Sequence, residues 1–181
     1  MRVISGSARG RRLKELPGMD TRPTTDQVKE SIFNIIQFDI EGRKVLDLFA
    51  GTGQMGIEAL SRGADHATFV DLAPAAAKTV RENVELTRFT ENAKVVQTDW
   101  RAFLTSCRDK FDLIFLDPPY HTDLLEKAME TIAAIDILSE HGIMVCESPL
   151  DKQLPELAAP YEKGKEYRYG KIKVTLYRRT V

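Results

Sequence analysis

The chain has 181 residues, which is enough for one domain with a proper hydrophobic core. Hydrophobic residues make up 43% of it and charged residues 29%, as in soluble globular proteins. No stretch approaches the ~20 apolar residues of a membrane span, and the N-terminus lacks an apolar signal core. Cys107, Cys146 and the three histidines show no metal or redox spacing, so we expect a cytoplasmic protein without a metal site.

The start of the chain is basic, although the net charge is only −1. Residues 2–5 and 12–16 flank a segment rich in Gly, Ser and Arg, and they predict a basic hairpin. A second excess of basic residues occupies the C-terminal end, from about residue 163 onward. If the fold brings both ends to one face, they form a basic footprint for a nucleic acid; otherwise these charges only keep the protein soluble.

Residues 22–26 predict the start of a helix. Thr24 is the expected N-cap, and Gln27 stands three residues later, as a capping box requires. Val28, Ile32 and Ile36 then give an apolar stripe at helical spacing. We expect residues 1–38 to form a hairpin-and-helix appendage on one compact domain of residues 39–181.

From residue 44 onward, predicted strands and helices alternate. This alternation predicts right-handed crossovers and a parallel sheet with helices on both faces. The last two segments, 161–168 and 171–179, predict an antiparallel hairpin that completes a mostly parallel, seven-stranded α/β sheet. The other expected strands are 44–50, 66–72, 93–98, 112–118 and 142–148, and the helices are 54–62, 74–88, 100–107 and 123–138.

A glycine-rich turn follows the first predicted strand. Gly51, Gly53 and Gly56 let the backbone pass close to a ligand, and the following helix start offers unpaired N–H groups. Asp71 ends the next strand and can accept both ribose hydroxyls of an adenosine cofactor. The pattern matches a dinucleotide fingerprint, so an NAD-dependent oxidoreductase is a competing interpretation.

Three features favour S-adenosylmethionine over a dinucleotide. Asp47 lies inside the first strand, where it can orient the glycine turn and the ammonium end of the donor. Asp99 and Trp100 follow the third strand and offer an acceptor and an aromatic ring to adenine, although Trp100 alone could be a core residue. The third feature is the motif that follows the fourth strand. The candidate cofactor-binding residues are Asp47, Phe49, Gly51, Gly53, Asp71, Leu72, Asp99 and Trp100.

That motif is Asp117-Pro118-Pro119-Tyr120, and it suits methyl transfer to the nitrogen of a planar amine. The lone pair of such a nitrogen is delocalised into the ring, so the enzyme must turn it toward the methyl donor. The Asp117 carboxylate and the Pro118 carbonyl can each accept one N–H, and Tyr120 can stack on the substrate. A turn after a core strand is the structural alternative, and the glycine loop upstream decides against it.

The chain resembles the class I, Rossmann-like S-adenosylmethionine methyltransferases, and its N-terminus is similar to that of the RsmD family of bacterial 16S rRNA guanine-N2 methyltransferases. The resemblance covers essentially the whole chain. The catalytic motif is shared with adenine-N6, cytosine-N4 and glutamine methyltransferases, whereas the N-terminal signature is specific. That signature is Ile4-x-Gly6, Gly10-Arg11-x-Leu13 and Arg22-Pro-Thr-Thr-Asp26-x-Val28-x-Glu30-Ser31-x-Phe33-Asn34.

The resemblance implies methylation of the exocyclic N2 amine of one guanine in 16S rRNA, within an assembling small ribosomal subunit. It implies S-adenosylmethionine as cofactor, no metal, no membrane, and a monomer. The alternative is an N6-adenine or other amino methyltransferase that acts on DNA, RNA or a protein glutamine. A non-catalytic assembly factor is a further alternative, although it could lose Asp117 or Tyr120, and both are present. The expected RNA contacts are Arg9, Arg11, Arg12, Arg22 and Thr24.

Overall fold

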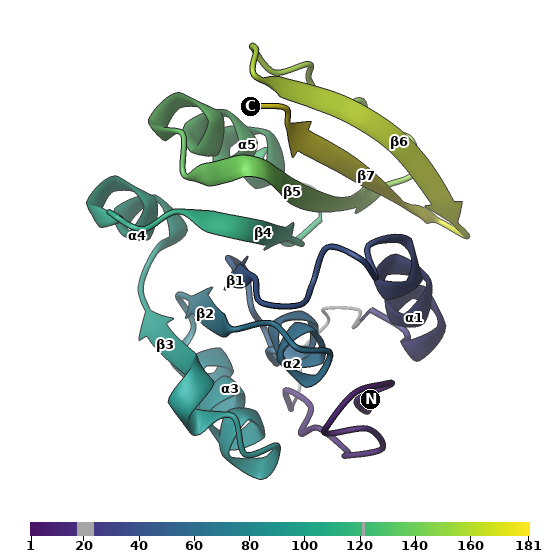
Figure 1. Cartoon of the computed structure of the whole chain (residues 1–181), viewed down its shortest axis with the longest axis vertical. Coiled ribbons are helices and arrows are strands. Elements are labelled where there is room, and N and C mark those ends of the chain that lie inside the picture. The colour runs from purple at the N-terminus through teal and green to yellow at the C-terminus, as the bar shows by residue number, and fades with distance from the viewer. Residues whose placement is uncertain (18–23, 121) are drawn as a thin grey trace.

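The computed structural model describes residues 1–17, 24–120 and 122–181, so the predicted RNA contact Arg22 lies outside the described residues. A seven-stranded sheet of order β3-β2-β1-β4-β5-β7-β6 forms the centre (Figure 1). Strands β1 to β5 are parallel, β7 runs antiparallel to β5, and β6 antiparallel to β7. The mostly parallel α/β sheet and its closing hairpin are thus confirmed. The strands are β1 (Lys44–Asp47), β2 (His66–Asp71), β3 (Ala93–Gln97), β4 (Phe111–Leu116), β5 (Leu138–Pro149), β6 (Tyr161–Tyr169) and β7 (Ile172–Arg179).

Helices cover both faces of the sheet, because both faces of the parallel strands are apolar and need burial. One core cluster joins the sheet to α1, α2 and α3, and includes Phe33, Ile57 and Val80. The other joins it to α4 and α5, and includes Leu104 and Met129. The helices are α1 (Asp26–Ile35), α2 (Gln54–Ser61), α3 (Pro74–Leu86), α4 (Trp100–Ser106) and α5 (Leu124–Ile135), with a 3₁₀ turn at Thr90–Asn92.

The start of α1 differs from the prediction, because its N-cap is Thr25 and not Thr24. The Thr25 side chain accepts a hydrogen bond from the Val28 N–H at 3.2 Å. Thr24 is buried instead, and its hydroxyl donates to Glu147 of β5 at 3.1 Å. Thr24 and Thr25 have the same capping side chain, so the sequence could not choose between them. Thr25 is the cap because Thr24 is engaged with Glu147.

Helix α5 also ends earlier than predicted, at Ile135 and not at 138. Asp136 adopts the left-handed conformation, with φ of 57°, and ends the helix. Its carboxylate accepts two hydrogen bonds from Arg179 of β7, both of 2.9 Å. Strand β5 can therefore start at Leu138, four residues before the predicted start.

The N-terminal hairpin is present as an isolated antiparallel bridge between Arg2 and Arg12 rather than as two strands. It packs outside α2, at the opposite end of the view from β6 and β7 (Figure 1). Backbone N–H groups of Ile4 and Ser5 donate to the buried Glu58 carboxylate at 2.8 and 3.0 Å. Gly6 approaches Ser61 so closely that a Cβ atom would lie 1.8 Å from its carbonyl oxygen. The hairpin is therefore fixed to the domain at the C-terminal end of α2.

The carboxyl ends of the strands carry acidic side chains on the face that α1, α2 and α3 cover. Asp47 ends β1 and Asp71 ends β2. Asp117 follows β4, and Glu147 lies near the end of β5. This edge holds the topological switch between β1 and β4, which is where open α/β sheets bind ligands. Over the part of the chain that the structure describes, no helix is long and apolar enough to cross a bilayer.

Candidate functional site

The glycine loop is held in place by Asp47. Its carboxylate is buried and accepts a hydrogen bond of 3.1 Å from the Gly56 N–H, in the first turn of α2. Burial raises the pKa of Asp47 to about 7, although the Gly56 hydrogen bond opposes the shift, and the nearby charge of Asp71 adds to it. Gly53 caps α2 with φ of 82°, a conformation that disfavours other residues.

Asp71 closes the other side of this loop. One carboxylate oxygen accepts from the Gly51 N–H at 2.9 Å, and the other from the Ala73 N–H at 3.0 Å. Each oxygen has a second lone pair, so the same carboxylate can also accept ribose hydroxyls. Leu72 follows directly and is 64% exposed, which leaves its side chain available to an adenine ring.

The predicted adenine contacts have structural roles as well. Asp99 is the N-cap of α4, and its Oδ2 atom accepts from the N–H groups of Arg101 and Ala102. Trp100 is 8% exposed and belongs to the core cluster beneath α4 and α5. The half-buried Phe49 ring lies 6.4 Å from it, centroid to centroid. An adenine ring could meet Oδ1 of Asp99 and an edge of this aromatic pair.

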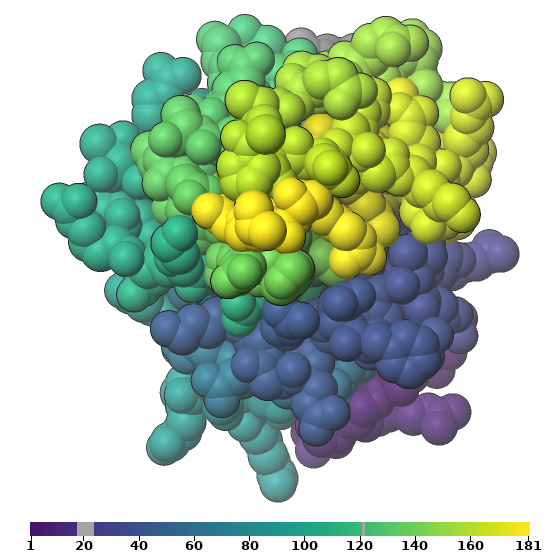
Figure 2. Space-filling view, turned by 45° about the horizontal axis from the view of Figure 1, so that its top comes forward, coloured from purple at the N-terminus to yellow at the C-terminus, as the bar shows by residue number. Residues whose placement is uncertain are grey.

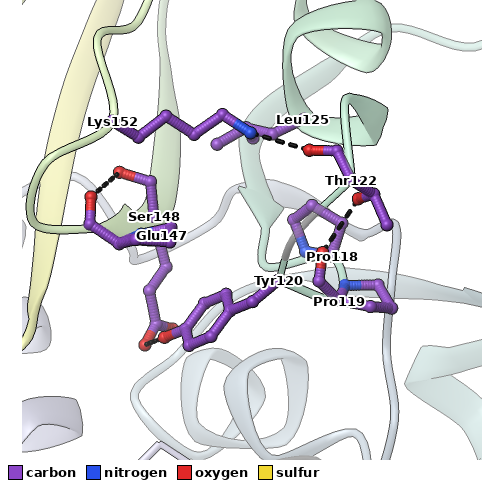
Figure 3. A pocket seen from close by; sticks show the side chains of 9 residues that line it. Pro118, Pro119, Tyr120, Thr122, Leu125, Glu147, Ser148 and Lys152 are labelled. Carbon is purple, nitrogen blue, oxygen red and sulfur yellow. Dashed lines mark hydrogen bonds between the residues drawn. The ribbon is translucent and has the colours of Figure 1, made fainter.

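A small pocket lies beside the Asp117 motif, between the ends of β4 and β5 and the start of α5. Pro118, Tyr120, Glu147 and Ser148 line it, and Tyr120 points toward the Glu147 carboxylate (Figure 3). The Tyr120 hydroxyl donates to Glu147 Oε1 over a long 3.5 Å. Residues of the motif and Glu147 therefore share one small pocket at the end of β4.

Glu147 is a site residue that the sequence interpretation missed. It is 9% exposed and directly follows the apolar run of residues 143–146 in β5. An acid that directly ends such an apolar run is a signal that could have identified it, since a carboxylate is rarely buried without a partner or a function. Its partners are Thr24, just before α1, and Tyr120 of the motif, and both are distant in sequence.

Asp117 and Glu147 act on each other electrostatically. Burial raises the pKa of Asp117 well above its usual range, and the negative charge of Glu147 raises it further. A hydrogen bond to Glu147 and the charge of Asp47 act in the same direction, whereas the Thr24 hydroxyl opposes them. Burial and the neighbouring acids therefore favour the protonated form of Asp117 in the free protein.

The predicted RNA contacts are divided between two places. Thr24 lies in the site, bonded to Glu147. Arg9, Arg11 and Arg12 are exposed on the hairpin. Residues 7 and 8, at its tip, bind Ser61 at the end of α2, which is ~10 Å along the helix from the glycine loop. Arg11 also donates to the backbone carbonyl at the end of α3.

The residues at the edge fit a cofactor that is cationic and carries a ribose. Space above Gly51 is open, because a Cβ atom placed there would meet nothing within 4 Å. Buried Gln54 Oε1, in the first turn of α2, has no hydrogen-bond partner within the described residues. Asp47 and Asp71 add negative charge on either side. Among residues 1–17, 24–120 and 122–181, no group of three His, Cys, Asp or Glu could hold a metal ion.

Comparison with known proteins identifies the family. The family model described as conserved hypothetical protein 95 matches residues 1–178. The chain belongs to this family. Its members include the RsmD methyltransferases, so the resemblance seen in the sequence is confirmed.

Two relatives of the family match nearly end to end. The chain is 42% identical over 182 residues to YlbH of Bacillus subtilis (strain 168), a protein named as a candidate rRNA methyltransferase, and each chain is covered to 99%. It is 32% identical over 179 residues to ribosomal RNA small subunit methyltransferase D of Escherichia coli (strain K12), covering 99% of this chain and 90% of that one.

A solved structure of the family agrees with the fold. The protein yhhF from Escherichia coli, described as a candidate methyltransferase, superposes with a TM-score of 0.89 at 32% identity. The superposition covers 99% of this chain and 98% of that chain. The fold is thus the Rossmann-like methyltransferase fold predicted from the sequence, and this family member is a methyltransferase. The individual site residues stay predictions.

Proposed function

We propose that this methyltransferase transfers a methyl group from S-adenosylmethionine to the exocyclic N2 amine of a guanine in 16S rRNA of the small ribosomal subunit. The observation that carries the proposal is the position of Asp117 and Pro118 directly beside the glycine loop, at one edge of one sheet. The names of the Escherichia coli and Bacillus subtilis relatives support rRNA as the substrate.

When bound, the cofactor supplies a methyl group already activated by a positive sulfur, so no metal is needed. Asp47 and Asp71 hold the glycine loop and receive the cationic and ribose portions of the donor. The Asp117 carboxylate accepts one N–H of the guanine amine, and the Pro118 carbonyl accepts the other. These acceptors turn the nitrogen lone pair toward the donor, and positioning supplies most of the rate.

Tyr120 fixes the plane of the base. A guanine in a folded RNA must leave its stack to reach the end of β4, and the Tyr120 ring can replace part of the stacking that it loses. The substrate is an assembling small subunit in the cytoplasm, and the enzyme acts as a monomer. Arg9, Arg11 and Arg12 contact the RNA at a distance from the base, because the hairpin tip lies at the far end of α2.

Transfer of a labelled methyl group tests this function. Small subunits from cells lacking the gene are incubated with the protein and labelled S-adenosylmethionine, and the 16S rRNA is digested to nucleosides. Label in N2-methylguanosine supports the proposal. Label in N6-methyladenosine or N4-methylcytidine, or in protein instead of RNA, would overturn it.

A further inference from the structure

Glu147 is placed beside Asp117 by the register of two parallel strands. Leu116 of β4 pairs with Cys146 of β5, so the next residue on each strand is Asp117 and Glu147. The Thr24 hydroxyl holds Glu147 Oε2 at 3.1 Å, while Oε1 has the long 3.5 Å contact with Tyr120. Oε1 is thus the oxygen on the side of Tyr120, and Glu147, Tyr120 and Pro118 line the same pocket (Figure 3).

Two adjacent carboxylates repel each other unless a proton, or the hydrogen-bond donors of a ligand, lie between them. Among the bases with an exocyclic amine, guanine presents a second donor, N1–H, next to its N2 amine. Adenine presents the N1 lone pair beside its N6 amine, and cytosine the N3 lone pair beside its N4 amine. A second carboxylate therefore attracts guanine and repels the other two.

We propose that Glu147 accepts the N1–H of the target guanine and is the residue that makes the site specific for guanine. The inference rests on the proposed function and identifies how its substrate is selected. Asp117 and the Pro118 carbonyl hold the amine, Glu147 Oε1 holds N1–H, and Thr24 keeps Glu147 in position. Guanine takes over the weak contact that the Tyr120 hydroxyl makes with Glu147 in the free protein.

The arrangement also explains why Thr24 is buried and is not the helix cap. A hydroxyl that donates to Glu147 Oε2 satisfies one side of the carboxylate and fixes its rotation. The other oxygen can then be aimed at a base held by Asp117. The Asp117 motif alone suits several planar amines. Glu147 of β5 would add the discrimination between guanine and the other bases.

The test uses 2-aminopurine, which keeps the N2 amine of guanine but has a lone pair at N1. The methylated position is first mapped in small subunits from cells lacking the gene. Small subunits are then reconstituted with 16S rRNA ligated to carry guanine or 2-aminopurine at that position. The kcat/KM for methyl transfer is measured for the wild type and Glu147→Gln. Glu140→Gln, an exposed acid at the other end of β5, is the matched control.

The wild type and Glu140→Gln are expected to prefer guanine by about 100-fold or more, because a site built around a donor rejects an analogue that lacks it. Glu147→Gln is expected to narrow this preference by at least about tenfold, since an amide N–H can donate to the N1 lone pair. A purely structural Glu147 would lower both rates together and leave the preference unchanged, and that result would overturn the inference.

If Glu147→Gln fails to bind S-adenosylmethionine, the wild-type rates on guanine and 2-aminopurine still test whether N1–H is recognised. Equal wild-type rates on guanine and 2-aminopurine would refute a role of N1–H in recognition. A wild type that leaves guanine-containing subunits unmethylated would refute the proposed function itself, so the two failures can be told apart.

Discussion

At the residue scale, acids at the sheet edge make hydrogen bonds within the protein besides the cofactor contacts predicted for them. Asp71 was expected to hold the ribose, and it also accepts the Gly51 and Ala73 N–H groups. The sequence could predict the position of Asp71, because the end of a strand can be inferred from an apolar run. It could not predict the hydrogen bond to Gly51, which depends on how the loop turns back over β2.

Asp71→Ala is expected to weaken S-adenosylmethionine binding. Loss of a charged acceptor costs roughly 1.5–3 kcal/mol, or about one to two decades in affinity. Calorimetric titration measures the change, and Asp65→Ala, an exposed acid just before β2, is the matched control. Unchanged affinity in a folded Asp71→Ala variant would place the ribose elsewhere.

The raised pKa of Asp47 predicts that cofactor affinity depends on pH. Burial raises its pKa to about 7 in the free protein, so the carboxyl is largely neutral below that pH. A cationic ammonium favours the charged form, and binding below pH 7 must therefore release a proton. Affinity should rise by up to about tenfold per pH unit toward pH 7 and then level off.

Titrations between about pH 5.5 and 7.5 measure this effect, below the pKa of about 8 of an α-amino group. Asp47→Asn should flatten the profile, because it removes the titrating group beside the loop. The Asp71 carboxylate and the titratable Asp117 face Asp47 from β2 and β4, and both remain in the Asp47→Asn control. A wild-type affinity that is constant over this range would contradict the account.

At the element scale, the N-terminal hairpin is hydrogen-bonded to a buried ion pair that the sequence did not reveal. Lys29 of α1 and Glu58 of α2 are both fully buried, and their charged atoms lie 3.8 Å apart. Lys29 also donates to the Arg2 carbonyl, and Glu58 receives the Ile4 and Ser5 N–H groups. Both residues fall within patterns typical of amphipathic helices, where charged residues are expected to face water.

Glu58→Ala is expected to lower the free energy of unfolding by about 3–5 kcal/mol, because Lys29 loses its buried partner and is left with the partly exposed Asp26, 3.9 Å away. Chemical denaturation measures the loss, and hydrogen exchange at Ile4 and Ser5 should increase. Glu82→Ala removes the partner of the exposed Lys14 and should cost about 1 kcal/mol or less. Similar losses in both variants would mean that the hairpin does not depend on the buried pair.

Strands β4 and β5 show why part of the site could not be predicted. The end of β4 follows from its apolar run and the two prolines, so Asp117 was identified. Glu147 stands beside it because of the β4–β5 register, and an early start of β5 at Leu138 is possible only once Asp136 has ended α5. Register between strands is a long-range property that local patterns do not fix.

At the scale of the whole molecule, the alternation of elements was enough to predict the sheet, its closing hairpin and the edge that carries the site. The C-terminal strands and residues 30–70 meet across one face, and N-terminal residues lie at its margin (Figure 2). The division into an appendage and a domain stays a prediction, although Val3 and Leu13 of the hairpin share a core cluster with α1 and α2.

Replacing Arg9, Arg11 and Arg12 together with alanine is expected to weaken binding to the small subunit. The slope of log affinity against log salt should fall in magnitude by up to about two, at ~0.7 for each phosphate that the variant no longer neutralises. S-adenosylmethionine affinity should change little. An equal salt slope for wild type and variant would assign these arginines to solubility and make the C-terminal strands the candidate RNA surface.

The most direct test of the central claim is the rate of labelled methyl transfer by Asp117→Ala to small subunits from cells lacking the gene, measured beside its affinity for S-adenosylmethionine. The account predicts that transfer is abolished while cofactor affinity stays within a few fold, because Asp117 holds the acceptor amine and not the donor. Asp117→Asn should keep partial activity, since an amide oxygen still accepts a hydrogen bond. An alanine variant with near-normal turnover would contradict the assignment of the end of β4 as the catalytic site.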